Sequence, residues 1–218
     1  MVEGNIQGLN VQSVADALSE SLRTRILQGD LPAGQKLTEA RITSEYQVAR
    51  TNAKAAIERL TAEGLLERDA HRSAQVATIT PRRIRDIYFT RNVIESQAYR
   101  ILARDREVPA AARAANQELA GATASDRSEL VVDSDVRFHR ALVDALGSER
   151  TTAAHMNLTN EMRLCMRQVQ HHRLLGSDEI AEEHNAILAA IEGGQPELAA
   201  RLGTDHLSRA EQILIANL

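Results

Sequence analysis

Apolar residues recur at helical spacing through the first third of the chain. An amphipathic helix is expected over 14–29, with Gly29 suited to end it. Its apolar stripe consists of Val14, Leu18, Leu22 and Ile26. A short helix should follow Thr38, which is a typical N-cap, and a third helix should cover 50–64. Pro and Gly in "GDLPAGQKL" predict a loop between the first two helices.

Two short segments after the third helix, "LLERD" and "AQVATIT", have β-compatible sequences. They can pair as a small hairpin. Three helices followed by a hairpin predict a winged helix-turn-helix over residues 10–79.

The helical pattern changes register at Thr80, which can cap a helix that begins with Pro81. From there to the end the periodicity predicts helices near 82–104, 109–121, 126–146, 149–172, 178–192 and 195–216. The breaks between them are short, so neighbouring helices should be antiparallel. The predicted fold is mainly α, with an antiparallel all-helical bundle over residues 82–217.

Composition indicates the cellular compartment of the protein and its possible partners. Hydrophobic residues make up 43% of the 218 residues but aromatic residues only 2%, so the core must be largely aliphatic. One cysteine, Cys165, excludes an internal disulfide and fits a reducing cytoplasm. We find no secretory signal and no apolar run near the roughly 18 residues that span a membrane. A cytoplasmic protein without membrane partners is therefore expected.

The formal net charge of −4 means that any nucleic-acid contact must come from a local basic patch. The second helix of a helix-turn-helix enters the major groove, and here it starts with "ARTNAKAA". Arg50 can bridge two guanine acceptors, Asn52 can pair with adenine, and Lys54 can meet guanine or a phosphate. Thr51 can bond a phosphate, and Arg41 adds charge. The alternative is an ordinary solvated helix face.

Four polar residues of the predicted bundle raise the question of a metal site. Asp135 and His139 are four apart, which places them on one face of a helix beside apolar residues. His184 and His206 also lie next to apolar positions on two later helices. Three imidazoles and a carboxylate suit zinc, nickel, manganese or ferrous iron. Taken alone, each histidine is more simply interpreted as a satisfied imidazole in or near the core.

Arg91 is a further candidate because it lies one helical turn before Glu95. The two could form an ordinary surface ion pair. If the helix instead turns this face inward, the planar guanidinium of Arg91 is suited to clamp the carboxylate of an effector.

Residues 27–76 resemble the winged helix-turn-helix of the GntR superfamily of bacterial repressors. The shared positions are Gly29, Leu31, Gly34, Leu37, Glu39, Arg50, Thr51, Leu60, Glu63, Gly64, Leu65 and Leu66. The resemblance implies that Arg50 and Lys54 contact DNA and that Arg72, at the wing tip, reaches the minor groove. Lys54 stands where the family usually has arginine, which removes a bidentate fork.

The bundle resembles the effector domain of the FadR-like branch of that superfamily, called FCD. The matching positions are Arg91, Ile94, Glu95, Asp135, Phe138, His139, Leu142, Glu183, His184, Ile187, Ala190, Ile191, Gly194, His206 and Leu207. The resemblance implies a divalent metal, zinc first, held by Asp135, His139, His184 and His206. It also implies an effector that reaches the metal and Arg91.

These observations predict a transcriptional regulator, expected to be a repressor and not an enzyme. A homodimer would bind an inverted repeat in double-stranded DNA, and a small organic acid in the bundle would control that binding. One alternative is a metal-dependent hydrolase or lyase, which would need a general base beside the metal. Glu183 is adjacent to His184 in sequence but should lie on a different face of the helix, so the chain offers no clear candidate for that base. Another alternative is a purely structural metal.

Overall fold

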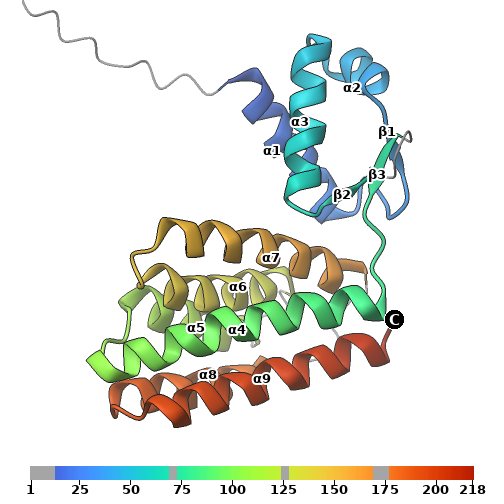
Figure 1. Ribbon diagram of the computed structural model, residues 1–218. Coiled ribbons are helices and arrows are strands. Elements are labelled where there is room, and N and C mark those ends of the chain that lie inside the picture. Colours follow the sequence, from blue (N-terminus) through green and yellow to red (C-terminus); the bar gives the residue numbers. More distant parts are fainter. Residues whose placement is uncertain (1–12, 69–72, 124–127, 169–176) are drawn as a thin grey trace, which may run out of the picture.

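The computed structural model describes residues 13–68, 73–123, 128–168 and 177–218. Within these residues, the amino-terminal module contains three helices and a small sheet, and all elements that follow it are helices (Figure 1). The helices of the module are α1 Val14–Gln28, α2 Glu39–Tyr46 and α3 Arg50–Ala62. Its strands are β1 Lys36–Leu37, β2 Leu66–Glu67 and β3 Ala74–Val76. This is the predicted winged helix-turn-helix.

Local chemistry sets the ends of these helices. Ser13 and Asp16 form a reciprocal capping box at the start of α1, and Gly29 ends that helix with a φ of 85°. The side chain of Thr38 accepts a hydrogen bond from the Arg41 amide at the start of α2. Of the predicted α1 stripe, the last three residues are buried, but Val14 is 53% exposed. Its place in the stripe was therefore wrong.

The wing has one strand more than the sequence predicted. β3 pairs antiparallel with both β1 and β2, in the order β1-β3-β2. Lys36–Leu37 was expected in a loop, yet it pairs with β3 and buries the side chain of Leu37. A strand of two residues is too short to show an alternating pattern, and the neighbouring Pro and Gly predict a loop there.

Within the described residues, the bundle contains six helices, as predicted. They are α4 Pro81–Asp105, α5 Ala110–Thr123, α6 Ser128–Asp144, α7 Glu149–Gln168, α8 Ser177–Glu192 and α9 Pro196–Ala216. Where the structure describes the chain, their ends agree with the predicted ends to within about two residues. The predicted end of α7 at 172 lies outside the described residues. In the described part of the chain, no helix is both long and apolar enough to cross a membrane.

The long α4 organises the bundle. It packs most extensively against α9 and also contacts α6, α7 and α8 (Figure 1). Its inward face buries apolar side chains such as Ile84 and Leu102, but also Arg91 and Glu95. A continuous apolar cluster extends from the amino-terminal module into the first turns of α4 and into α7 and α9. The two modules therefore share part of their core.

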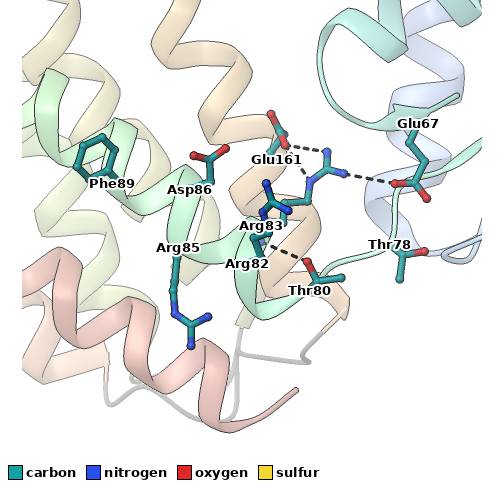
Figure 2. A pocket seen from close by; sticks show the side chains of 9 residues that line it. All are labelled: Glu67, Thr78, Thr80, Arg82, Arg83, Arg85, Asp86, Phe89 and Glu161. Carbon is teal, nitrogen blue, oxygen red and sulfur yellow. Dashed lines mark hydrogen bonds and ion pairs between the residues drawn. The ribbon is translucent and has the colours of Figure 1, made fainter. Parts of the chain in front are cut away.

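A polar contact joins the modules beside this shared core (Figure 2). Arg83, near the start of α4, pairs with Glu161 of α7 at 2.7 Å. The same guanidinium donates to the Gly64 carbonyl at 2.5 Å and lies 3.7 Å from Glu67 of the wing. On the other side, the Gln168 amide nitrogen donates to the carbonyl oxygen of Ala77 at 2.9 Å. Both α4 and α7 are thus tied to the amino-terminal module.

Candidate functional site

Four buried side chains from three helices converge inside the bundle. α6 contributes Asp135 and His139, α8 contributes His184, and α9 contributes His206. One potential ligand atom from each residue lies within 4.8 Å of the others. All four residues are buried, with His139 and His184 fully so. The structure therefore brings together the four predicted ligands.

The atoms at the centre of this cluster are the Nε2 atoms of the histidines and an Asp135 oxygen. The Nε2 atoms of His139 and His206 are 3.1 Å apart. Oδ1 of Asp135 lies 3.6 Å from Nε2 of His139 and 3.5 Å from Nε2 of His184. Nε2 of His184 is buried and has no hydrogen-bond partner among the described residues. A buried nitrogen without a partner is costly, and a metal ion would satisfy it.

The other ring nitrogen of each histidine faces outward to a hydrogen-bond acceptor. Nδ1 of His139 lies 2.8 Å from Glu95, Nδ1 of His184 lies 3.1 Å from Oδ1 of Asn116, and Nδ1 of His206 lies 2.7 Å from Glu183. Because a carboxylate or amide oxygen only accepts, we assign the proton to Nδ1 in each ring. The Nε2 lone pairs then face inward. This is the usual arrangement of metal-binding histidines.

That assignment leaves two lone pairs facing each other. Nε2 of His139 and Nε2 of His206, 3.1 Å apart, repel unless a proton or a cation lies between them. The donor set therefore fits a divalent metal ion, with borderline nitrogen ligands and one hard oxygen.

Buried charges around the cluster shift its acid–base behaviour. Burial opposes ionisation of Asp135, but the three imidazoles hold the pKa of its carboxyl below the ordinary value. Burial and the neighbouring imidazoles lower the pKa of His184 well below the usual range, and burial also lowers the pKa of His206. For His139, Glu95 and Asp135 outweigh burial and raise the pKa. The site thus favours a negative Asp135 beside neutral rings of His184 and His206.

Glu95 connects this cluster to Arg91. Its carboxylate accepts hydrogen bonds from Nε of Arg91 at 2.7 Å and from Tyr99 at 2.9 Å, and it lies 2.9 Å from Nε2 of His155. The Arg91–Glu95 pair is therefore present but fully buried, which excludes the surface pair considered from the sequence. Burial opposes its ionisation, yet Arg91 and His139 hold the pKa of Glu95 well below its usual value.

Two buried polar groups on α4 lack partners in the described structure. Nη2 of Arg91 and the hydroxyl of Tyr88 are both buried without a hydrogen bond. The Arg91 guanidinium carbon lies 5.2 Å from the centre of the Tyr88 ring. Unpaired buried donors of this kind mark a place where a ligand could bind.

The outer partners of the histidines were not identified from the sequence. Asn116 and His155 carry no motif, so no local signal could have indicated them. Glu95 and Tyr99 could have been placed on the same face as Arg91, because they follow it at helical spacing on α4. Glu183 was expected on a different face of its helix from His184, and no contact with another histidine was predicted for it. Its carboxylate in fact contacts the outer face of His206 and pairs with Arg209 at 2.5 Å.

The predicted DNA-binding residues lie on the amino-terminal module. At the start of α3, Arg50 has an 83% exposed side chain and pairs with Glu39 at 2.6 Å, and Thr51 is exposed. Lys54 is also exposed and lies 3.7 Å from Glu58, while Asn52 is partly buried. The side chains of Arg50, Thr51 and Lys54 border a shallow hollow of about 590 Å³. The exposed α3 face is accessible to a DNA groove.

Arg41 and Arg72 are the two remaining predicted DNA-binding residues. Arg41, on α2, is exposed and lies 3.7 Å from Glu45. Arg72 lies outside the described residues.

Comparison with known proteins yields matches in both modules. Residues 14–76 match the profile of the gntR family of bacterial regulatory proteins, and residues 86–209 match the FCD domain. A curated relative from Paenarthrobacter nicotinovorans, "Probable D-xylose utilization operon transcriptional repressor", is 27% identical over 90% of this chain and 86% of its own length.

Solved structures have the same fold. A GntR transcriptional regulator from Rhodococcus sp. RHA1 superposes with a TM-score of 0.80 at 23% identity, covering 94% of this chain and 98% of that chain. A metal-free FCD domain of another regulator superposes with a TM-score of 0.55 at 20% identity, covering 65% of this chain and 97% of that chain.

Proposed function

Because the chain belongs to the FCD-containing GntR regulators, and is thus a DNA-binding transcriptional regulator with an effector-binding domain, we propose that a metal-bound organic acid controls its operator binding. Residues 82–217 would form the effector domain and residues 10–79 the DNA-binding domain. The observation that carries this proposal is the buried convergence of one carboxylate and three imidazoles, each imidazole with its outer nitrogen already satisfied.

The proposed ligands are Asp135, His139, His184 and His206. Three nitrogen donors and one oxygen donor suit zinc first, with nickel, manganese or ferrous iron as alternatives. When bound, the metal would offer a Lewis-acidic position to an effector oxygen. The acceptors beyond the rings keep the Nε2 atoms directed at that position.

The proposed effector is a small carboxylate, and Arg91 is its proposed anchor. The unpaired Nη2 of Arg91 and the unpaired hydroxyl of Tyr88 are both donors in a buried setting. Burial makes a charge-assisted hydrogen bond to a carboxylate strong. The carboxylate of Glu95 contacts Arg91 on one side and His139 on the other. The proposed effector anchor, Arg91, and the proposed metal ligand His139 therefore share one buried carboxylate.

Helix α7 is the proposed route from this site to the DNA-binding module. His155 contacts Glu95, and Met162 contacts the Arg91 guanidinium. On the same helix, Glu161 holds Arg83 against the wing and Gln168 bonds the linker. An effector that shifts α7 would therefore change how the amino-terminal module is held, near the hinge at Thr80. Such coupling requires different effector affinities in the two arrangements.

The proposed partner is an inverted repeat in cytoplasmic double-stranded DNA. A homodimer would place one α3 in each half-site, because operator symmetry follows protein symmetry. Arg50, Thr51, Asn52 and Lys54 would make the groove contacts, with Arg41 and Arg72 beside them. We expect repression, which the name of the Paenarthrobacter relative supports.

We favour a regulator over a hydrolase or lyase. Glu183, the acidic residue next to His184 in sequence, has its carboxylate bonded to the outer nitrogen of His206 and to Arg209. It is thus engaged away from the side on which a metal-bound water would need a base.

The test combines metal analysis, thermal shift and operator binding on the full chain. We expect about one metal per chain in the wild type and none in His139→Ala. His155→Ala, which removes a buried histidine outside the cluster, should keep its metal. A panel of mono- and dicarboxylic acids, sugar acids and D-xylose should contain an acid that raises the melting temperature of the wild type but not that of His139→Ala.

The same acid should change affinity for a duplex selected from a random pool. If metal is present but no acid changes either melting or DNA binding, the metal is structural. If the wild type and His155→Ala both lack metal, the proposal fails.

A further inference from the structure

Three side chains of fixed charge are buried among the described residues, and their charges do not cancel. They are Asp135 and Glu95, which are negative, and Arg91, which is positive. Burial opposes ionisation of both carboxyls, but the imidazoles hold the pKa of Asp135 below its ordinary value, and Arg91 holds the pKa of Glu95 well below its own. Glu183 is paired with Arg209 and adds no net charge. Two negative charges and one positive charge therefore leave the buried cluster with a net charge of −1.

The net charge changes sign when the four proposed ligands hold a divalent ion. With the ion on the Nε2 atoms and a proton on each outer Nδ1, the three imidazoles of the cluster are neutral. The two positive charges of the ion then bring the net charge from −1 to +1. An unbalanced charge is costly in a buried site. A ligand with one negative charge restores neutrality, whereas a dianion, a neutral sugar or a zwitterion leaves the site charged.

Three buried polar atoms on α4 and α7, which pack together, have no partner among the described residues. They are Nη2 of Arg91, the hydroxyl of Tyr88 and Nδ1 of His155. Nε2 of His155 lies 2.9 Å from Oε1 of Glu95. Because a carboxylate oxygen accepts, we assign the proton of His155 to Nε2, so that Nδ1 keeps its lone pair. Arg91 and Tyr88 therefore offer two donors to a ligand, and His155 offers one acceptor.

We propose that the effector is a hydroxy acid with a single carboxylate. Its carboxylate accepts from Nη2 of Arg91 and from the hydroxyl of Tyr88. A hydroxyl of the same molecule donates to Nδ1 of His155, because an ionised carboxylate has no proton to give. An ammonium group could also donate there, but its positive charge would undo the balance. The inference rests on the metal and the effector of the proposed function, and it narrows that effector to one chemical class.

The three unpartnered atoms are close enough for one small molecule. Oε1 of Glu95 contacts both Nε2 of His155 and Nε of Arg91, at 2.9 Å and 2.7 Å, so these two side chains are neighbours. The guanidinium carbon of Arg91 lies 5.2 Å from the centre of the Tyr88 ring. A ligand held by Arg91 is therefore beside both of the other groups.

The first experiment measures binding to the zinc-loaded full chain by isothermal titration calorimetry, with the acids arranged as matched pairs. D-gluconate and D-glucarate share a hydroxylated carbon chain but carry one and two carboxylates, and lactate and hydroxymalonate form a smaller pair of the same kind. We expect the monoanion of a pair to bind at least about 100-fold more tightly than the dianion, because the second charge is unbalanced. The zinc content is measured after each titration, so that removal of zinc by a chelating dianion is recognised.

A second set of pairs tests the hydroxyl. Propionate is lactate without its hydroxyl, and butyrate is related to 3-hydroxybutyrate in the same way. We expect each hydroxy acid to bind at least about tenfold more tightly than its deoxy analogue, because the analogue leaves Nδ1 of His155 buried without a partner. Every other acid of the panel that binds is compared with its own deoxy analogue.

His155→Gln tests which residue recognises the hydroxyl. The glutamine amide can still donate to Glu95, but the acceptor at the Nδ1 position is lost. Affinity for the hydroxy acid should fall about tenfold, while affinity for its deoxy analogue stays within about threefold and the zinc content is unchanged. Thr159→Val is the matched control, since Thr159 lies one turn later on α7, is also buried, and already donates to the Met156 carbonyl at 2.9 Å. It should alter neither affinity.

Tyr88→Phe provides a second variant that keeps the size of the side chain. It removes a buried donor that has no partner among the described residues. Because this donor is assigned to the carboxylate, the change should weaken the hydroxy acid and its deoxy analogue by a similar factor, about three- to tenfold.

The outcomes distinguish this inference from the proposed function. If the chain holds zinc and no acid of the panel binds, the effector of the proposed function fails, and this inference fails with it. If a dicarboxylate binds at least as tightly as the matching monocarboxylate, the effector stands but the charge argument is overturned. If a deoxy acid binds as tightly as its hydroxy analogue, or if His155→Gln lowers both affinities equally, the hydroxyl contact is overturned.

Discussion

Asn116 allows the proposed metal centre to be tested without removing a ligand. Its Oδ1 accepts the hydrogen bond of Nδ1 of His184, while its Nδ2 donates to the Ala181 carbonyl at 3.1 Å and to Asn185 at 2.8 Å. The amide is therefore fixed in one orientation. In Asn116→Ala, the Nδ1 proton of His184 loses its acceptor, and Nε2 is no longer held toward the cluster.

The expected loss of metal affinity follows from what else holds His184. Removal of an outer hydrogen-bond partner costs about 10- to 100-fold in metal affinity. The ring of His184 also stacks on Phe138, with centroids 3.6 Å apart and planes 7° from parallel. Because that stack keeps the plane of the ring, we expect the lower part of the range, about 10- to 30-fold, or about 1.4–2 kcal/mol.

The assay is competition for zinc against a chelator of known affinity. Asn185→Ala is the control, because it removes one bond to Asn116 and leaves the His184 acceptor in place. Thermal unfolding of the metal-free forms separates lost metal affinity from lost stability. If Asn116→Ala binds zinc as tightly as wild type, His184 does not ligate through Nε2 in the proposed way.

Four further results are expected. Gly203→Ala should destabilise by about 1–3 kcal/mol in thermal unfolding, because its Cβ would lie 2.2 Å from the ring of Tyr99, whereas a neutral or positive effect would contradict this packing. Burial raises the pKa of the Cys165 thiol from 9.0 to about 12, so its thiolate is about a thousandfold scarcer. A disulfide reagent at pH 8 should therefore label Cys165 only when the protein unfolds, and rapid labelling of the folded protein would contradict this. Arg50→Ala should lower affinity for a selected operator by about 1–3 kcal/mol and relax preference at one base pair; an equal loss on all sequences would assign Arg50 to phosphate. Glu161→Gln breaks the ion pair that joins α7 to Arg83 at the start of α4, so it should reduce the effect of the acid on operator affinity without changing acid binding. Unchanged coupling would exclude this route.

Elements with a strong local pattern were predictable from the sequence. The six bundle helices were found because each carries an apolar stripe over several turns and ends at a break rich in Gly or Pro. The Asp135–His139 pair was also accessible, since four-residue spacing on a helix fixes a shared face. The two-residue β1 was missed because nothing so short shows a period, and its pairing with β3 is a contact across the wing.

Contacts between helices were not accessible in the same way. Asn116 on α5 meets His184 on α8 across 68 residues of chain, and Glu95 on α4 meets His139 on α6 across 44. Such pairs depend on the position of one helix relative to its neighbour along the helix axis. A shift by one turn, about 5.4 Å, would replace each partner by another residue while leaving every helical pattern unchanged. The resemblance to a family could imply the ligands, but not the residues behind them.

Small side chains on α9 explain how that register is set. Ala199, Ala200, Gly203 and Ala210 are buried on the face that contains His206, and α4 makes its most extensive contact there. At Gly203 the absence of a Cβ leaves room for the ring of Tyr99. Tyr99 in turn bonds Glu95 and lies 3.0 Å from Nδ1 of His139. The close approach of α4 and α9 therefore determines which residues surround the cluster, so that packing of glycine and alanine, rather than the ligand motif, places the imidazole of His206 against that of His139.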